Sequence, residues 1–416
     1  GESWQRLDAS LPQDVYLHAI REDVVNRNML YLGTERGVSY TTDGGKSWKP
    51  LKLNLPTVAV HDLAVKGDTL VVGTHGRSIW GFDHLNILRA LTPEVRGSGS
   101  YLFPVADATR WQYNRGPGDK FAGQNPLNGA VIHYWLKEAP QSEISMEIVD
   151  DAGRTVASLS SKRRPAIGYS DNPQGESSNI NSGLLSKNAG INQVVWNLNY
   201  TGAELIENGK LDFGGPVFGP QAIPGLYKVK LRVDGREETS VLRLNPDPRV
   251  TLSAADYKLQ LATALAIRDD VSRLTLLVRQ LRSVRQQLQN RNTLLKQVPP
   301  ASDLVRESEA LIKKLDELEE QMHNPKAEVV YDILAFKGGA KLYSRIAFLH
   351  DVAAEGDGPT PQGVRTVYAE QKSELDKYEA GLRGLLGELA TLNATAKRLE
   401  VPHILVPELD ALRTLR

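Results

Sequence analysis

The sequence predicts a multidomain β plus α protein, in which β-sheet repeats and a β-sandwich precede a C-terminal antiparallel helical bundle. Two observations lead to this prediction. All six Trp lie before residue 200, whereas only 8 of the 35 Gly lie after residue 250. From about residue 253 the apolar residues recur every seven positions, which is the period of packed helices. We therefore predict domains over 1–98, 99–250 and 251–416.

An internal repeat organises the first of these domains. "VYLHAI" at 15–20 matches "VAVHDL" at 58–63, and "LYLGTERGVSY" at 30–40 matches "LVVGTHGRSIW" at 70–80, with a period of 40 to 44 residues. Short alternating strands at this spacing are typical of four-stranded β-propeller blades. Two blades and a fragment cannot close a ring. We therefore expect further blades upstream, in the same protein or in another chain.

The stretch "TTDGGKSW" at 41–48 is the most distinctive motif, and the opening "GESW" repeats its end, so that the chain begins inside its own repeat. Five of its residues resemble a complete Asp-box, the turn motif of sialidase-type and sortilin-type propellers: Thr41, Asp43, Gly45, Ser47 and Trp48. In such a turn the Asp accepts backbone N–H bonds, the Gly supplies an unusual dihedral and the Trp packs into the blade. The motif predicts a structural role in preference to catalysis.

Strand-like alternation continues between about 99 and 247. Tight-turn residues stand between successive runs, as in Asp151-Ala-Gly153 and Asp234-Gly235, where hairpins require them. Short antiparallel strands in this number predict an immunoglobulin-like β-sandwich. Two long insertions, at about 160–190 and 200–224, are predicted to be surface loops.

Helical periodicity dominates the last domain. Heptad spacing predicts one helix over 254–297, packed antiparallel to a second long helix over 361–399. An amphipathic helix at about 303–322, ended by Asn324-Pro325, and a shorter one at 340–353 lie between them in sequence and complete the bundle. The charged residues of these helices are expected to form their solvated faces.

The composition excludes several classes of function. Lys+Arg and Asp+Glu both number 50, so net charge gives no reason to expect nucleic acid binding. Cysteine is absent, which excludes disulfides, thiolate metal sites and Cys nucleophiles. No apolar run approaches the roughly 18 residues of a membrane span. No metal motif, phosphate loop or nucleophile elbow is present, and we predict no metal and no cofactor.

Glycoside hydrolysis usually needs two carboxylates across a sugar-binding cleft. The candidates in the repeats are Glu35, Asp43, Asp62 and Asp83. Two of them occupy Asp-box positions and Asp62 lies in a strand-like repeat, so no pair is compelling. We assign no catalytic residue, and expect residues 1–416 alone to lack glycosidase activity.

A ligand-facing rim is the best local candidate for binding. In "GTHGRSIW", His75 and Arg77 could bind carboxylates or sugar hydroxyls, and Trp80 could stack on a ring. The alternative is that these residues lock the edge of the blade, because Trp80 occupies the repeat position of Tyr40. Repeat equivalence favours this packing role.

The order of "THGRSIWGFD", "NPLNGAVIHYWL", "PGLYKVKLRVDG", "DPRV" and "RLTLLVRQLRSVRQQL" resembles the C-terminal region of large bacterial exported BNR/Asp-box proteins, which are sortilin-like or glycosyl hydrolase-like. The resemblance implies an extracytoplasmic location. It is compatible with a binding or scaffold protein for protein or polysaccharide ligands, which we prefer. The alternative is the accessory part of a secreted glycoside hydrolase whose catalytic carboxylates lie upstream.

Overall fold

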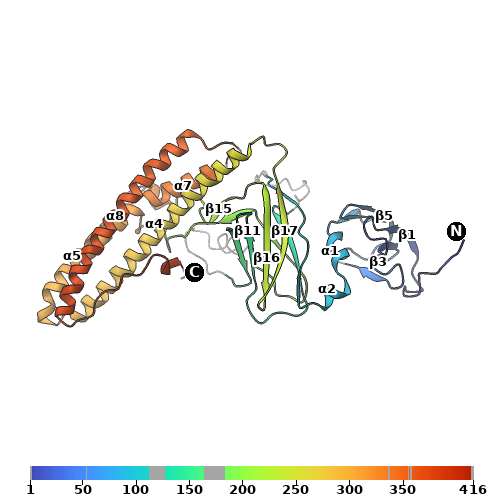
Figure 1. The fold of residues 1–416 in the computed structure, drawn as a ribbon, viewed down its shortest axis with the longest axis horizontal. Coiled ribbons are helices and arrows are strands. Elements are labelled where there is room, and N and C mark those ends of the chain that lie inside the picture. The colour runs from blue at the N-terminus through green and yellow to red at the C-terminus, as the bar shows by residue number, and fades with distance from the viewer. Residues whose placement is uncertain are drawn as a thin grey trace. The chain divides into compact units, whose positions relative to one another are not determined.

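The computed structural model describes residues 2–52, 54–111, 127–163, 183–335, 338–354, 356 and 358–413. The fold is mixed β and α, with several sheets and a C-terminal helical region (Figure 1). It divides into two compact units. The first contains Gly1–Pro104, His133–Ala139 and Asn188–Asn192, and the second contains the remaining residues.

Two antiparallel sheets form most of the first unit. The first sheet has the order β1-β2-β3-β4 and the second has the order β5-β6-β7. Their strands are β1 (Leu17–Glu22), β2 (Leu30–Thr34), β3 (Gly37–Thr41), β4 (Lys49–Leu51), β5 (Val60–Lys66), β6 (Thr69–Thr74) and β7 (Ile79–Phe82). The strands predicted from the internal repeat are therefore present in both copies.

The two sheets share one hydrophobic core. Tyr31 and Val38 of the first sheet are buried in the same cluster as Val60 and Leu63 of the second. The sheets come close enough that a Cβ added to Gly33 would lie 2.6 Å from the Val60 carbonyl oxygen. Glycine at this position permits the approach.

The segment after the second sheet contributes to the same unit. Leu85 and Leu88 of α1 (Leu85–Ala90) lie in the core of the two sheets. Thr92 caps the start of helix α2 (Pro93–Gly97), since its hydroxyl accepts from the Val95 N–H. Strand β8 (Ser100–Leu102) belongs to a three-stranded sheet in the order β13-β10-β8, with β10 (Ala130–Leu136) and β13 (Gly190–Trp196).

A five-stranded sheet in the order β12-β11-β16-β17-β9 dominates the β part of the second unit. The strands are β9 (Ala108–Thr109), β11 (Ser145–Val149), β12 (Thr155–Ser160), β16 (Gly225–Val233) and β17 (Arg236–Asn245). Asp234 and Gly235 connect β16 to β17 with φ of +46° and +78°, as expected for a tight hairpin turn. The predicted strands of this region are confirmed, and the immunoglobulin-like assignment stays a prediction.

The structure corrects the prediction of a surface loop at 200–224. Ala203, Ile206 and Leu211 are buried in the core of the helical region. Strands β14 (Asn199–Thr201) and β15 (Phe218–Gln221) pair at the two ends of this segment. The segment is packed because its apolar side chains cover apolar residues of the helices, which would otherwise be exposed to water. Most of the other predicted loop, at about 160–190, lies outside the described residues.

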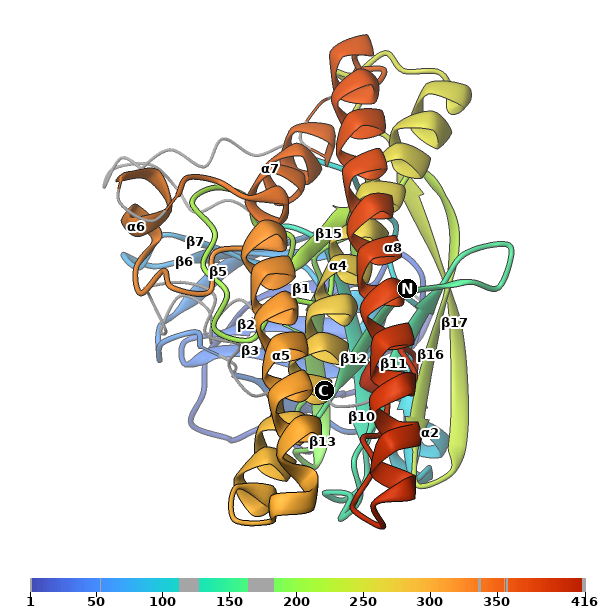
Figure 2. The ribbon, with the colours of Figure 1, turned by 90° about the vertical axis from the view of Figure 1, so that its left-hand side faces the viewer.

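The helical region contains α4 (Ala254–Leu295), α5 (Ser302–Met322), α6 (Val330–Ala335), α7 (Leu342–Ala354) and α8 (Gln362–Arg398), with short 3₁₀ turns at Pro299–Ala301 and Ala411–Arg413. The predicted helix over 254–297 is a single helix, and its heptad residues are buried: Ile267, Leu274, Leu281, Leu288 and Leu295. Helices α4, α5 and α8 lie side by side (Figure 2).

The predicted antiparallel packing of the two long helices is wrong. Asp270 contacts Tyr368, and Arg273 contacts Glu379 further along α8, so α4 and α8 run parallel. Helix α5 is antiparallel to α4, because Arg282 contacts Glu319 while Arg291 contacts Ser308.

The lengths of the helices explain this correction. The 42 residues of α4 extend about 63 Å, whereas the 21 residues of α5 return only about 31 Å. Helix α7 continues the return and also packs on α4. Gln260, near the start of α4, donates to the Gly356 carbonyl just after α7. The chain is thus back at the start of α4 when α8 begins.

Candidate functional site

The Asp-box-like turn uses its polar groups internally. Asp43 Oδ1 accepts from the Ser47 N–H at 2.9 Å and from Thr41 Oγ1 at 2.6 Å, and Asp43 Oδ2 accepts from Ser47 Oγ at 2.5 Å. The hydrogen bonds from Ser47 and Thr41 hold the pKa of Asp43 well below its usual range. Thr41 Oγ1 in turn accepts from the N–H of Gly45, whose φ is +89°. Trp48 Nε1 donates to the Leu7 carbonyl at 2.7 Å.

The predicted rim residues lie around the turn between β6 and β7. His75 and Arg77 are exposed. Trp80 is half-buried against the core of the two sheets, and its Nε1 donates to the Arg77 carbonyl at 2.8 Å. The geometry therefore gives the indole a local hydrogen-bond partner and a packing surface.

Three imidazoles lie in a row on the first unit. The ring centroids of His18 and His61 are 4.6 Å apart, and those of His61 and His75 are 4.9 Å apart. The sequence prediction included only His75, although the alignment of "VYLHAI" with "VAVHDL" already places His18 and His61 at equivalent positions. Within the described ranges, no cluster of three or more His, Asp or Glu side chains has a geometry able to hold a metal ion.

The other candidate carboxylates also contact neighbouring side chains. Asp62 pairs with Arg21 at 2.5 Å, and Asp83 Oδ1 accepts from Thr69 Oγ1 at 2.9 Å. Glu35 lies 3.8 Å from the Nε atom of Arg36. Each of these three carboxylates is therefore paired with an arginine or hydrogen-bonded to a neighbouring side chain.

A buried ion pair that the sequence did not reveal fixes α1 to the first sheet. Arg89 of α1 donates to both oxygens of Asp23, at 2.9 Å from Nε and 2.9 Å from Nη2. The Asp23 carboxylate is inaccessible to solvent and also accepts from the Tyr31 hydroxyl at 2.7 Å. Burial alone would raise the pKa of Asp23, but the hydrogen bonds from Arg89, Asn26 and Tyr31 hold it below its usual range.

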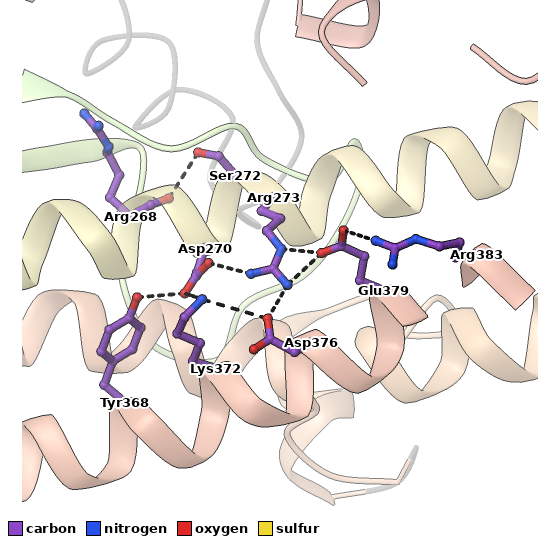
Figure 3. A network of polar contacts seen from close by, with 9 residues as sticks. All are labelled: Arg268, Asp270, Ser272, Arg273, Tyr368, Lys372, Asp376, Glu379 and Arg383. Atoms are coloured by element: carbon purple, nitrogen blue, oxygen red, sulfur yellow. Dashed lines mark hydrogen bonds and ion pairs between the residues drawn. The ribbon is translucent and has the colours of Figure 1, made fainter. Parts of the chain in front are cut away.

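Helices α4 and α8 are joined by the polar network of Figure 3. Arg273 contacts Asp270 at 3.2 Å, Asp376 at 2.5 Å and Glu379 at 2.7 Å. The Tyr368 hydroxyl donates to Asp270 at 2.7 Å (Figure 3). Burial and this hydrogen bond raise the pKa of Tyr368. The network sets the parallel register of the two helices.

A second network joins α4 to α5. Glu319 is buried and contacts Arg282 at 2.7 Å, Arg285 at 2.5 Å and His323 at 2.9 Å. Burial opposes ionisation, but the hydrogen bond from His323 and the charge of Arg282 lower the pKa of Glu319 to about 2. Burial lowers the pKa of His323. The interactions of Glu319 favour the charged carboxylate.

A groove of about 430 Å³ lies in the second unit, beside the turn between β11 and β12 and the start of α4. Its polar lining includes Asp151, Arg154, Tyr200 and Lys258. Charges of both signs are present, so the lining selects neither anions nor cations by charge alone.

The first unit also exposes a group of apolar and aromatic side chains on β1 and beside it, which we call the β1 surface: Tyr16, Leu17, Ile20, Val24 and Val25. Leu17 is 48% exposed and Ile20 is 50% exposed, although both belong to a hydrogen-bonded strand. No sequence pattern distinguished these residues from the buried residues of β5.

No family model matches the chain, and no curated protein matches it. YCF48 from Cyanidioschyzon merolae is 13% identical with a TM-score of 0.17, and the match covers 58% of this chain and 60% of that one. Two structures of the extracellular domain of BT4673 from B. thetaiotaomicron are 11% and 10% identical, with TM-scores of 0.14 and 0.15; each match covers 56% of this chain and 26% of theirs. Similarity at this level identifies neither a fold nor a function. No described helix is long and apolar enough to cross a membrane.

Proposed function

We propose that the chain is a binding or scaffold protein whose first unit binds a protein partner through the β1 surface. The observation that supports this proposal is the exposure of Leu17 and Ile20 within an ordered strand. Large apolar side chains exposed together on one strand are typical of a protein interaction site. The propeller and immunoglobulin-like assignments, and an extracytoplasmic location, belong to the same proposal through the resemblance of the sequence.

The acidic side chains favour binding over glycoside hydrolysis. Hydrolysis requires an acid and a base that face a substrate across a cleft. Asp43 is hydrogen-bonded within its turn, Asp62 is paired with Arg21, and Asp83 accepts from Thr69. The hydrolase alternative therefore rests on the sequence resemblance and not on the geometry of these residues.

The proposal can be tested by affinity capture from an extract of the source organism. We expect the protein to retain partners that are lost when Leu17 and Ile20 are both changed to Ser. Val241→Ser is the matched control, because Val241 is also exposed on a strand but lies in the second unit. Equal capture by the two variants would overturn the proposal. Turnover of an oligosaccharide by the unmodified protein would instead favour the hydrolase.

A further inference from the structure

The two sheets of the first unit are copies of one structural element, even in their irregularities. Strand β1 has a register shift between Leu17 and Ala19, where it faces Thr34 and Gly33. Strand β5 has the same shift between Val60 and Asp62, where it faces Thr74 and Gly73. Both shifts fall on a histidine of the sequence repeat, His18 in β1 and His61 in β5. A shared bulge fixes the equivalence of the two strands residue by residue.

Equivalent residues of the two strands differ sharply in their burial. Leu17 corresponds to Val60 and Ile20 corresponds to Leu63. The two residues of β5 are 0% and 1% exposed, whereas those of β1 are 48% and 50% exposed. Val60 and Leu63 are buried because the first sheet packs against them. Leu17 and Ile20, at the corresponding positions of the first sheet, are also apolar, but they are exposed.

The sheet that covers β5 presents a different face. Tyr31, Val38 and Tyr40 of the first sheet lie in the shared core with Val60 and Leu63. The interface is thus heterologous, since one face of the repeat packs on the opposite face of the next copy. Such an interface leaves one face uncovered at each end of the series, and at the first end this face carries Leu17 and Ile20.

We propose that the face formed by Leu17 and Ile20 binds one further four-stranded sheet of the same repeat, carried by a partner polypeptide segment that presents side chains like Tyr31, Val38 and Tyr40. This inference rests on the proposed function and names its partner. Within the present chain the face that carries Tyr31 and Val38 is already buried against β5. The partner is therefore an additional repeat.

The absence of cysteine makes the test direct. Ile20→Cys is prepared in the full chain and in a chain that carries a second copy of residues 13–57 inserted before residue 13. We expect maleimide to label Ile20→Cys about tenfold more slowly, or slower still, in the extended chain, because a docked sheet requires an opening step before reaction. Val241→Cys, in the second unit, should be labelled at the same rate in both chains.

A matched variant separates docking from mere attachment. In this variant the inserted copy carries Lys at its positions equivalent to Tyr31 and Tyr40. We expect it to restore rapid labelling of Ile20→Cys. Unchanged labelling in the first extended chain, or slowing that persists with the Lys-bearing copy, would overturn the inference. If labelling is unchanged but Leu17→Ser with Ile20→Ser still abolishes partner capture, the proposed function stands with a different partner.

Discussion

The replacement of Arg89 by Met tests how α1 is held on the first sheet. The variant keeps an apolar side chain but leaves the Asp23 carboxylate buried with its donors from Val25, Asn26 and Tyr31. Breaking a buried ion pair by removing one partner costs about 3 to 5 kcal/mol. Because these three hydrogen bonds remain, we expect a loss of about 3 kcal/mol, at the lower end of that range.

Amide hydrogen exchange in β2 measures this loss locally. A decrease of about 3 kcal/mol corresponds to exchange on the order of 100-fold faster at Tyr31, if exchange follows the opening equilibrium. Arg27→Met is the matched control, because the Arg27 and Glu22 pair is largely exposed at 3.0 Å and should contribute less than about 1 kcal/mol. If both variants accelerate exchange equally, the buried pair does not stabilise the unit.

Three further predictions concern the two units. Leu281→Asp should destabilise the helical region by roughly 3 to 5 kcal/mol, because Leu281 is fully buried, whereas Leu259→Asp on the exposed face of α4 should change the melting temperature little. The lowered pKa of Glu319 means that its contribution to folding stability is complete above the unfolded pKa of about 4.3. This contribution is lost as the pH falls toward about 2. Glu319→Gln should therefore flatten the fall in melting temperature over this pH range, and an unchanged slope would contradict the assignment. Asp43→Ala removes the acceptor of three hydrogen bonds. It should lower the free energy of unfolding, measured in urea, by about 1 to 2 kcal/mol, which is more than Asp83→Ala should lower it.

Elements with a regular period could be predicted from the sequence, but their partners could not. The heptads that include Leu274 and Leu281 predicted a single long helix because the buried face of a helix repeats along its own chain. The direction of α8 depends on the combined length of α5 and α7, which no local pattern encodes. In the same way, the Gly/Pro-rich composition of 200–224 suggested a loop, although Ile206 and Leu211 pack into the helical core.

The candidate site shows the same division between local and long-range information. The Asp-box-like turn is formed by residues within eight positions of one another, so turn chemistry alone predicted contacts such as that between Asp43 and Ser47. The pair of Asp23 and Arg89 joins residues 66 positions apart. Neither residue belongs to a motif, and only the packing of α1 on the sheet brings them together.

The exposure of the β1 surface can be interpreted only by comparing the sequence repeat with the fold. The repeat makes Leu17 and Val60 equivalent, and by itself predicts that both are buried. In the structure only Val60 is covered. The sheet that covers it is the first sheet, in which the equivalent residue Leu17 is itself exposed. An apolar position that is buried in one copy and exposed in the other indicates an unfilled interface, because the same side chain type would otherwise cost solubility in a sheet that faces water. The difference between the copies therefore supports the proposed binding face and the kind of sheet proposed to fit it.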